Sequence, residues 1–474
     1  MTVTPTPSVP TRGTLLGTSA AIFLIRFFPT LASVVALVWL ARSTPVGYYG
    51  RYQSFWVQWQ VLHAVACLGL PTLVLTYPAA RLRGLARASQ PRHWAALVSW
   101  VGLVAGGFVG VQWWGDSVFA PWQAGLFLLL NVPVAILEAY ALGRRQLRAV
   151  ALVSVGYAGL FMLSHGLLVR HIIASEQLMG TLLLASALRL AALGYLARRS
   201  PAVSVLAEPL AWPTVRSHWA HTAFNDVVQV LFRWVDKLAL NFLLPAALFA
   251  LYFNGTLDVP FLPLLLGAAG STLLLHFGEP GLTDAQRLAT LRVAAVLLGR
   301  LVLPLFCFLL VFRRELFGVV FAHRYDAAVP LFMVSSLVLP LRAYNFTALL
   351  QHKGQGQRIS RGAMLDLALA LVLMYPLYRL LGLAGVALAF VLSTYAQAGY
   401  YLAHTARLLR VPWASLLPWR PWAGQLLGAA LGLGLLHTLL VTWLAERPVL
   451  AAGAGVLALW LVGQLWLARR KSSG

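Results

Sequence analysis

Among the apolar stretches of this sequence, HWAHTAFNDVVQVLFRWVDKLALNF carries the densest group of charged side chains. Asp226, Arg233 and Lys237 are separated by seven and four residues, so a helix would place all three on one face. Asn225 and Gln229 add amide groups nearby. Guanidinium and ammonium groups beside amides can hold a phosphate or a carboxylate, because they donate charge-assisted hydrogen bonds. We interpret this face as the charged wall of a water-filled cavity.

Asp236 leaves a second interpretation of the same stretch open. It lies three residues after Arg233, so the two side chains could neutralise each other on the helix surface. Lys237 would then extend its ammonium group outward to the membrane surface. On that interpretation the charges are structural and form no binding site.

Three other charged residues within apolar runs are further candidates for the site. Arg26 has no acid in its own run, and an unpaired charge at the bilayer centre costs about 2.5–3.5 kcal/mol. We therefore expect Arg26 to face a cavity or to pair with an acid such as Asp258. Asp258 lies just before two prolines in TLDVPFLPLL and is either that partner or a proton carrier. Arg342 lies beside Tyr344 and Asn345, where functional and structural roles are both open.

The elements that must position these residues are membrane-spanning helices. Of the 474 residues, 60% are hydrophobic and 10% are charged, whereas a soluble domain carries about 25% charged residues. A spanning helix needs about 20 apolar residues, and the apolar runs are too long for strands. We predict an all-α polytopic membrane protein with about fourteen transmembrane helices. The predicted helices cover 14–41, 52–78, 94–114, 119–142, 149–169, 176–196, 217–242, 245–276, 291–313, 328–350, 362–380, 382–406, 423–443 and 449–468.

The net charge of +23 comes from 36 basic and 13 acidic residues. On a soluble chain it would suggest nucleic acid, but basic residues of membrane proteins gather in cytoplasmic loops. With the amino terminus placed inside, alternate predicted loops hold most of the Lys and Arg residues. We therefore expect both termini in the cytoplasm, contact with membrane lipids and no nucleic-acid partner.

A proline-bearing loop at about 197–216 divides the first twelve predicted helices into two sets of six. The sets share a local similarity, GYYG after the first helix and LYFNG after the seventh, at an offset near 204 residues. Six is an even number, so both sets enter the membrane in the same direction, as in a parallel repeat. The predicted parts are an N-terminal lobe at 1–212, a C-terminal lobe at 213–410 and two appended helices at 411–474.

Signatures of covalent catalysis are absent from the sequence. There is no phosphate-binding loop, no GxSxG and no HExxH. The predicted outer loops lack the acidic pair that a membrane glycosyltransferase or polymerase would need. No His or Cys spacing is typical of a metal site. We expect a protein that is not an enzyme, with no catalytic residue, no metal and no cofactor.

Three stretches resemble a known family. ALVWLARSTPVGYYGRYQSFW, RWVDKLALNFLLPAALFALYFNGTLDVPFLPL and the run from FAHRYDAAVPLFMV to GLAGVALAFVLSTYAQAGYYL are similar to Wzx-like polysaccharide biosynthesis proteins. These are lipid-linked oligosaccharide flippases of the MATE/MOP exporter superfamily. The similarity covers about 1–410 at low identity.

The resemblance implies two six-helix lobes in a pseudo-two-fold, MATE-like arrangement with a central cavity that opens by alternating access. It implies flipping of undecaprenyl-pyrophosphate-linked oligosaccharide in the bacterial inner membrane for surface polysaccharide such as O-antigen. A polysaccharide polymerase or export machinery would be a partner. The expected substrate-binding cations are Arg26, Arg233, Lys237 and Arg342, the expected cavity acids are Asp226, Asp236 and Asp258, and the expected polar cavity residues are Asn225 and Gln229.

Two related functions stay open. A peptidoglycan-precursor flippase has the same fold and similar charges. A MATE-like cation-coupled exporter would favour a binding acid in the N-terminal lobe, and the first two predicted helices contain none.

Overall fold

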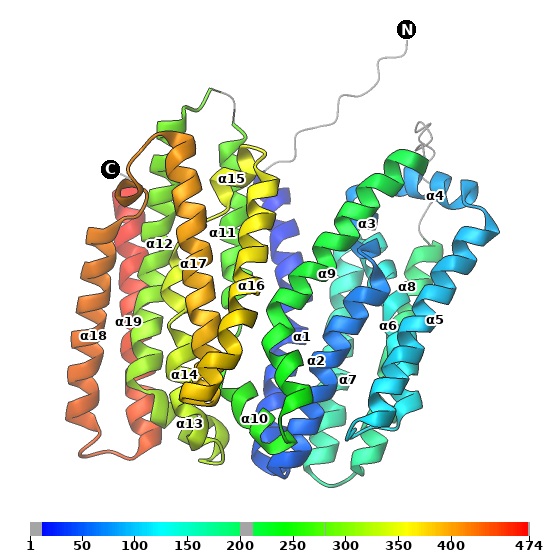
Figure 1. The fold of residues 1–474 in the computed structure, drawn as a ribbon, viewed down its shortest axis with the longest axis horizontal. Coiled ribbons are helices and arrows are strands. Elements are labelled where there is room, and N and C mark those ends of the chain that lie inside the picture. The colour runs from blue at the N-terminus through cyan, green and yellow to red at the C-terminus, as the bar shows by residue number, and fades with distance from the viewer. Residues whose placement is uncertain (1–11, 200–211, 280, 473–474) are drawn as a thin grey trace. The chain divides into compact units, whose positions relative to one another are not determined.

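The computed structural model describes residues 12–199, 212–279 and 281–472, and every regular element in these ranges is a helix (Figure 1). This confirms the prediction of an all-α fold. Two compact units divide the chain, Met1–Ala247 and Leu248–Gly474.

The first unit contains nine complete helices within its described residues. These are α1 (Arg12–Ser43), α2 (Val46–Cys67), α3 (Leu70–Thr76), α4 (Ala79–Ala88), α5 (Pro91–Trp114), α6 (Pro121–Gly143), α7 (Leu147–Val169), α8 (Ser175–Arg199) and α9 (Trp212–Leu243). Helix α1 packs along α7, and α6 contacts α3, α5 and α8. Helix α9 packs on α2 and α3, so the helix with the predicted cavity charges Asp226 and Arg233 belongs to this unit.

The second unit contains longer helices separated by short ones. Its elements are α10 (Ala246–Gly255), which begins just before the unit boundary, α11 (Leu262–Phe277), α12 (Asp284–Val311), α13 (Arg313–Phe321), η1 (Asp326–Ala328), α14 (Val329–Ser336), η2 (Leu339–Ala343), α15 (Ala348–His352), α16 (Gly356–Leu381), α17 (Leu383–Leu409), η3 (Trp413–Ser415), α18 (Trp419–Leu440) and α19 (Glu446–Ser472). Helices α16 and α17 form an antiparallel pair, and α12 packs on α18.

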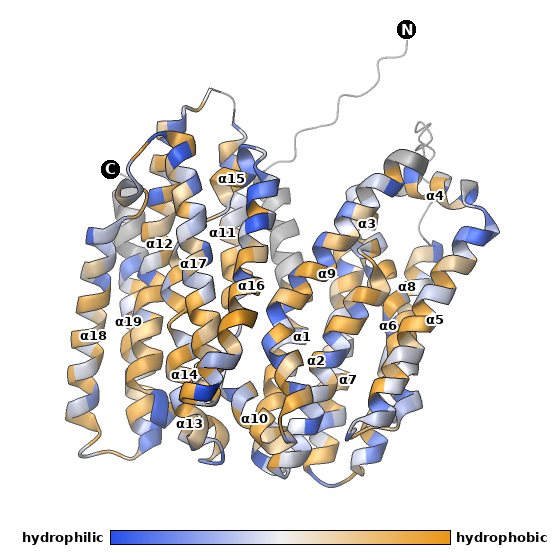
Figure 2. Ribbon diagram, in the orientation of Figure 1, coloured by the Kyte–Doolittle hydropathy of each residue, from blue (hydrophilic) through white to orange (hydrophobic). Residues whose placement is uncertain are grey.

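Ten helices of the described chain are long and apolar enough to cross a membrane, or eleven if the bent pair α2 and α3 forms one span. The predicted count of fourteen is therefore not reached by unbroken apolar helices. Helix α9 covers the seventh predicted run but is rich in charge. The eighth and tenth predicted runs are each broken into shorter helices. Figure 2 shows hydrophobic residues along the long helices and hydrophilic ones gathered at their ends.

One local structure occurs twice along the chain. Helix α1 ends at Ser43, and α2 begins just after Pro45. Helix α9 ends at Leu243, and α10 begins just after Pro245. The helix boundaries of the two copies are thus offset by 200 residues, and a proline stands just before the second helix in both.

Candidate functional site

The break between α2 and α3 is the feature of the first unit that positions its charged helix. Leu68 and Gly69 have φ angles of 46° and 66°, and the two helices meet at a bend of 51°. Left-handed residues end an α-helix and leave carbonyl groups of its last turn without helical partners. The indole nitrogen of Trp219 on α9 donates a hydrogen bond of 2.7 Å to one of them, the carbonyl of Leu68.

One stripe of α9 faces this break. Trp219, Ala223 and Asp226 follow at intervals of four and three residues, which is the spacing of one helix face. A Cβ atom on Gly69 would lie 2.8 Å from the backbone of Ala223, so the two chains approach each other closely. The hydroxyl of Thr72 on α3 donates a hydrogen bond of 2.6 Å to the Asp226 carboxylate. Asp226, a predicted cavity acid, is therefore tied to α3.

A second stripe of α9 carries the exposed polar side chains. Asn225, Gln229 and Arg233 are spaced by four residues, and all three are exposed. The structure thus brings together on one face the predicted amides and one predicted cation. The predicted face with Asp226, Arg233 and Lys237 is divided, since Asp226 and Lys237 are half-buried.

Asp236 lies on the packed side of α9, where 7% of the residue is exposed. Its carboxylate lies 3.4 Å from the ammonium nitrogen of Lys237, which also lies 5.8 Å from the centre of the Trp234 ring. Both side chains of this ion pair are largely buried. Lys237 therefore packs within the unit instead of extending outward. It is one partner of the Asp236 carboxylate.

Arg26 lies on α1 and its side chain is exposed, one residue after the buried Ile25. Ile25 packs with Ala141 and Val150, so this turn of α1 is anchored on α6 and α7. The predicted cation thus points away from the core of its unit. An exposed guanidinium within an apolar helix is consistent with either a ligand or a charged partner.

Sequence reasoning missed one ion pair between helices of the first unit. Arg189 on α8 forms a salt bridge with Glu138 on α6, and its guanidinium lies 4.6 Å from the centre of the Tyr157 ring on α7. The only signal was one acid and one base inside separate apolar runs. Their spacing of 51 residues carries no helical periodicity that could have paired them.

In the second unit, Asp258 lies outside a helix. The prediction placed it in the middle of the helix 245–276, but α10 ends at Gly255 and α11 begins at Leu262. Pro260 and Pro263 explain the break, because proline lacks an amide hydrogen and disfavours helix at the preceding residue. Asp258 is exposed on this connecting segment.

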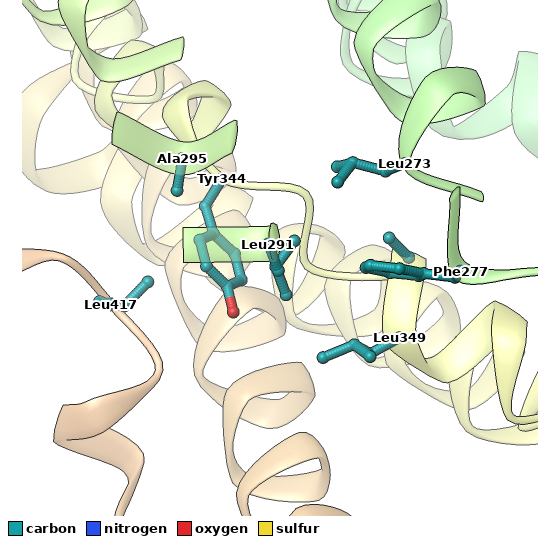
Figure 3. Packing of buried hydrophobic residues seen from close by; sticks show 8 residues of the cluster. Leu273, Phe277, Leu291, Ala295, Tyr344, Leu349 and Leu417 are labelled. Atoms are coloured by element: carbon teal, nitrogen blue, oxygen red, sulfur yellow. The ribbon is translucent and has the colours of Figure 1, made fainter. Parts of the chain in front are cut away.

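Arg342 also lies in a break. The predicted helix 328–350 is divided into α14, η2 and α15, and Arg342 is exposed in the last turn of η2. Tyr344, next but one, is extended with φ −134° and is 5% exposed. Its ring packs among Leu291, Ala295 and Leu417 (Figure 3). This core cluster fixes the break and so sets the place of Arg342.

A cavity of about 240 Å³ opens beside Arg342 within the second unit. Its polar lining includes Asn345, Thr394, Gln397 and Tyr401, while Leu266 and Leu298 contribute apolar wall. Tyr401 is held by a hydrogen bond of 2.8 Å from its hydroxyl to the carbonyl of Ile359. The wall thus combines one guanidinium with amides and hydroxyls, groups that bind anions and sugar hydroxyls.

A separate polar cluster joins the turn after α13 and the start of η1 to the start of α19. The His323 ring lies 3.0 Å from the Asp326 carboxylate and 3.1 Å from the Glu446 carboxylate. These contacts raise the pKa of His323 above its usual value, chiefly through the hydrogen bond with Asp326 and then through the charge of Glu446. Among residues that the structure describes, no three His, Cys, Asp or Glu side chains are arranged to hold a metal ion.

Comparison with known proteins relates the chain to solved structures alone. No family model matches the sequence, and no curated protein matches it. The fold is similar to "Lipid II flippase MurJ, inward closed conformation", with a TM-score of 0.68 and 12% identity over 97% of this chain and 100% of that one.

Two MATE structures match over a shorter part of this chain. An inward-facing multidrug resistance MATE transporter of the MOP superfamily matches 82% of this chain and 98% of its own, with a TM-score of 0.57 and 13% identity. A MATE structure in complex with MaL6 matches 84% of this chain and 96% of its own, with a TM-score of 0.60 and 12% identity. The chain thus shares its fold with these flippase and transporter structures, as the sequence resemblance implied.

Proposed function

We propose that this chain, a multi-pass membrane protein with the MOP fold, flips a lipid-linked oligosaccharide from the cytoplasmic to the outer leaflet of a bacterial inner membrane by alternating access. The substrate is undecaprenyl-pyrophosphate-linked oligosaccharide for surface polysaccharide such as O-antigen, delivered to a polymerase or export machinery. Both termini lie in the cytoplasm. On this proposal the chain is a transporter, and no covalent step occurs on it.

The observation that carries the proposal is the exposure of cations on two helices of the first unit, α9 and α1. Arg233 stands in an exposed row with Asn225 and Gln229, and Arg26 is exposed on α1. A pyrophosphate entering a region of low dielectric needs positive charge, and arginine binds phosphate bidentately. Amide groups next to the guanidinium suit the hydroxyls of the attached sugars.

The second unit supplies a site of matching chemistry. Arg342 lines a cavity of about 240 Å³ together with Asn345, Thr394 and Gln397. These groups can hold a charged or hydroxyl-rich part of the headgroup. An apolar groove of about 810 Å³, lined by Leu402, Ala406 and Trp413 among others, lies along α17 and η3 and could hold part of the prenyl tail.

A peptidoglycan-precursor flippase is the second candidate, and the fold comparison favours it. The MurJ structure matches 97% of this chain, whereas the MATE structures match 82% and 84% of it. A MATE-like exporter of organic cations fits less well, because the exposed charges at Arg26, Arg233 and Arg342 would repel such substrates.

Depletion of the protein from cells tests the proposal. We expect undecaprenyl-linked oligosaccharide to accumulate on the inner leaflet while surface polysaccharide falls and lipid II stays constant. Accumulation of lipid II in place of the oligosaccharide would assign the chain to peptidoglycan synthesis. If both lipids and the surface glycan stay unchanged while drug sensitivity rises, the chain is an exporter and the proposal is wrong.

A further inference from the structure

The first unit contains a large apolar cavity that the proposed function does not use. Its volume is about 720 Å³, which lies within the roughly 300–1,000 Å³ of sites that hold drug-sized ligands. The walls come from α3, α4, α5 and α6 and from the ends of α8 and α9. Apolar side chains such as Leu73, Leu97 and Leu137 make up most of the lining. Such a surface suits a hydrocarbon chain.

Helix α4 forms one side of the cavity and is amphipathic. Leu82, Leu85, Ala86 and Ser89 line the cavity, at the intervals of three and four residues that define one helix face. Two further arginines of α4, at positions 81 and 87, are not part of the lining. Figure 1 shows this short helix between α3 and α5 at one end of their unit. A short basic amphipathic helix is typical of a segment that lies in the membrane surface.

The rim of the cavity is basic. Arg83 of α4 and Arg198 of α8 both line it, and His93 of α5 lies nearby. Within the described part of the chain, no salt bridge joins Arg83 or Arg198 to an acid. The loops at this end of the unit also carry Arg144 and Arg145. Basic pockets between transmembrane helices bind anionic lipid headgroups at the cytoplasmic surface.

Two tryptophans make the cavity a preformed space. The indole nitrogen of Trp100 on α5 donates a hydrogen bond of 3.1 Å to the carbonyl of Val65. Trp219 on α9 donates to the carbonyl of Leu68. Both rings line the cavity, and both carbonyls belong to the last turn of α2 before its break. The walls are thus fastened to the same break that positions Asp226.

We propose that this cavity binds an anionic phospholipid of the surrounding leaflet. One acyl chain occupies the apolar space, and the phosphate contacts Arg83 and Arg198 at the rim. Because the bound chain would lie against Trp100 and Trp219, the lipid would stabilise the junction of α2, α3 and α9. The inference is independent of the substrate that the chain transports.

Native mass spectrometry of the purified full-length protein tests this site. Phosphatidylglycerol and phosphatidylcholine with identical acyl chains are added to the protein in detergent, and the bound lipid is counted. We expect phosphatidylglycerol to be retained preferentially. Replacing both rim arginines (Arg83→Ala with Arg198→Ala) should weaken its binding roughly tenfold to thirtyfold, from about 1 kcal/mol for each basic residue near a membrane surface.

Two matched controls locate the effect. The double variant Arg81→Ala with Arg87→Ala also removes two positive charges, both from α4 residues outside the cavity lining. It should leave the preference for phosphatidylglycerol unchanged. Ala96→Phe places a ring in the cavity lining and should reduce retention of both lipids, whereas Ala95→Phe, on the adjacent exposed position outside the lining, should not.

Three results would overturn the assignment. Equal retention of the two lipids by the wild type would show that the rim does not select a negative charge. Equal losses in the two double-arginine variants would show that the charge effect is not at the cavity. Displacement of phosphatidylglycerol by undecaprenyl phosphate at equal concentration would identify a polyprenyl chain as the occupant instead.

Discussion

The hydroxyl of Thr72 donates a hydrogen bond of 2.6 Å to the carboxylate of Asp226, which lies 154 positions further along the chain. This bond joins the short helix after the α2 break to the charged helix of the same unit. The bond fixes the orientation of the Asp226 side chain. On the adjacent stripe of α9, the side chains of Asn225, Gln229 and Arg233 are exposed.

Removal of this hydrogen bond should loosen α9. We expect Thr72→Val to lower the free energy of unfolding by about 1 kcal/mol. A buried hydrogen bond to a charged group would contribute more, but this one is partly open to solvent. Thermal unfolding in detergent measures the loss. Thr76→Val is the matched control, because the Thr76 hydroxyl bonds within its own helix to the Thr72 carbonyl. Equal losses in both variants would contradict a special role for the Asp226 bond.

The conformation of Gly69 should be required for the same junction. Gly69→Ala places a methyl group 2.8 Å from the backbone of Ala223 at a φ of +66°. We expect a loss of about 1–2 kcal/mol from the left-handed backbone, with a further loss from displacement of α9. Gly102→Ala in α5 meets no atom within 4 Å and should be neutral or stabilising. A stable Gly69→Ala protein would show that α9 does not pack as described.

The exposed arginines should be needed for transport but not for folding. We expect Arg233→Ala and Arg26→Ala each to lower the initial rate of substrate flipping roughly tenfold to a hundredfold, because each removes charge-assisted hydrogen bonds worth about 1.5–3 kcal/mol. Membrane expression should be unchanged. Arg216→Ala, exposed near the start of α9, serves as the control. Normal surface glycan in both test variants would remove these residues from the substrate site.

The ion pair inside the first unit should be essential as a pair. Glu138→Gln leaves the Arg189 charge largely buried, and loss of one partner of a buried pair costs about 3–5 kcal/mol. Thermal unfolding should therefore show a large drop in Tm. The double variant Glu138→Leu with Arg189→Met should recover most of the stability, since it leaves no isolated charge. A double variant as unstable as the single one would contradict this account.

The His323 cluster should make stability depend on pH. Its folded-state pKa is raised by Asp326 and Glu446, so the charged ring stabilises the folded state below its ordinary pKa of about 6.5. This stabilisation is lost as pH rises through the higher folded pKa. We expect Tm of the wild type to fall across that window and His323→Gln to flatten the profile. His171→Asn, at an exposed left-handed position, should leave the profile unchanged.

Sequence patterns were sufficient for the class of the fold. Apolar run length and charge density depend on neighbouring residues alone, so they predicted an all-helical polytopic chain and the runs that hold Arg26, Asp226, Arg233 and Arg342. The prolines are also visible in the sequence, but the predicted helices 245–276 and 328–350 continue across them. Pro260 and Pro340 instead mark the breaks that hold Asp258 and Arg342, because a packed core such as that around Tyr344 can stabilise a non-helical segment.

Only the tertiary structure decided which charges have which partners. Helical spacing placed Asp226 and Arg233 on one face, yet packing of α9 on α3 bonds Asp226 to Thr72 and leaves Arg233 exposed. Glu138 and Arg189 meet because α6 packs on α8. These pairings depend on which helices are neighbours in space. That information is absent from local periodicity, which reports the face of a helix but not what the face packs against.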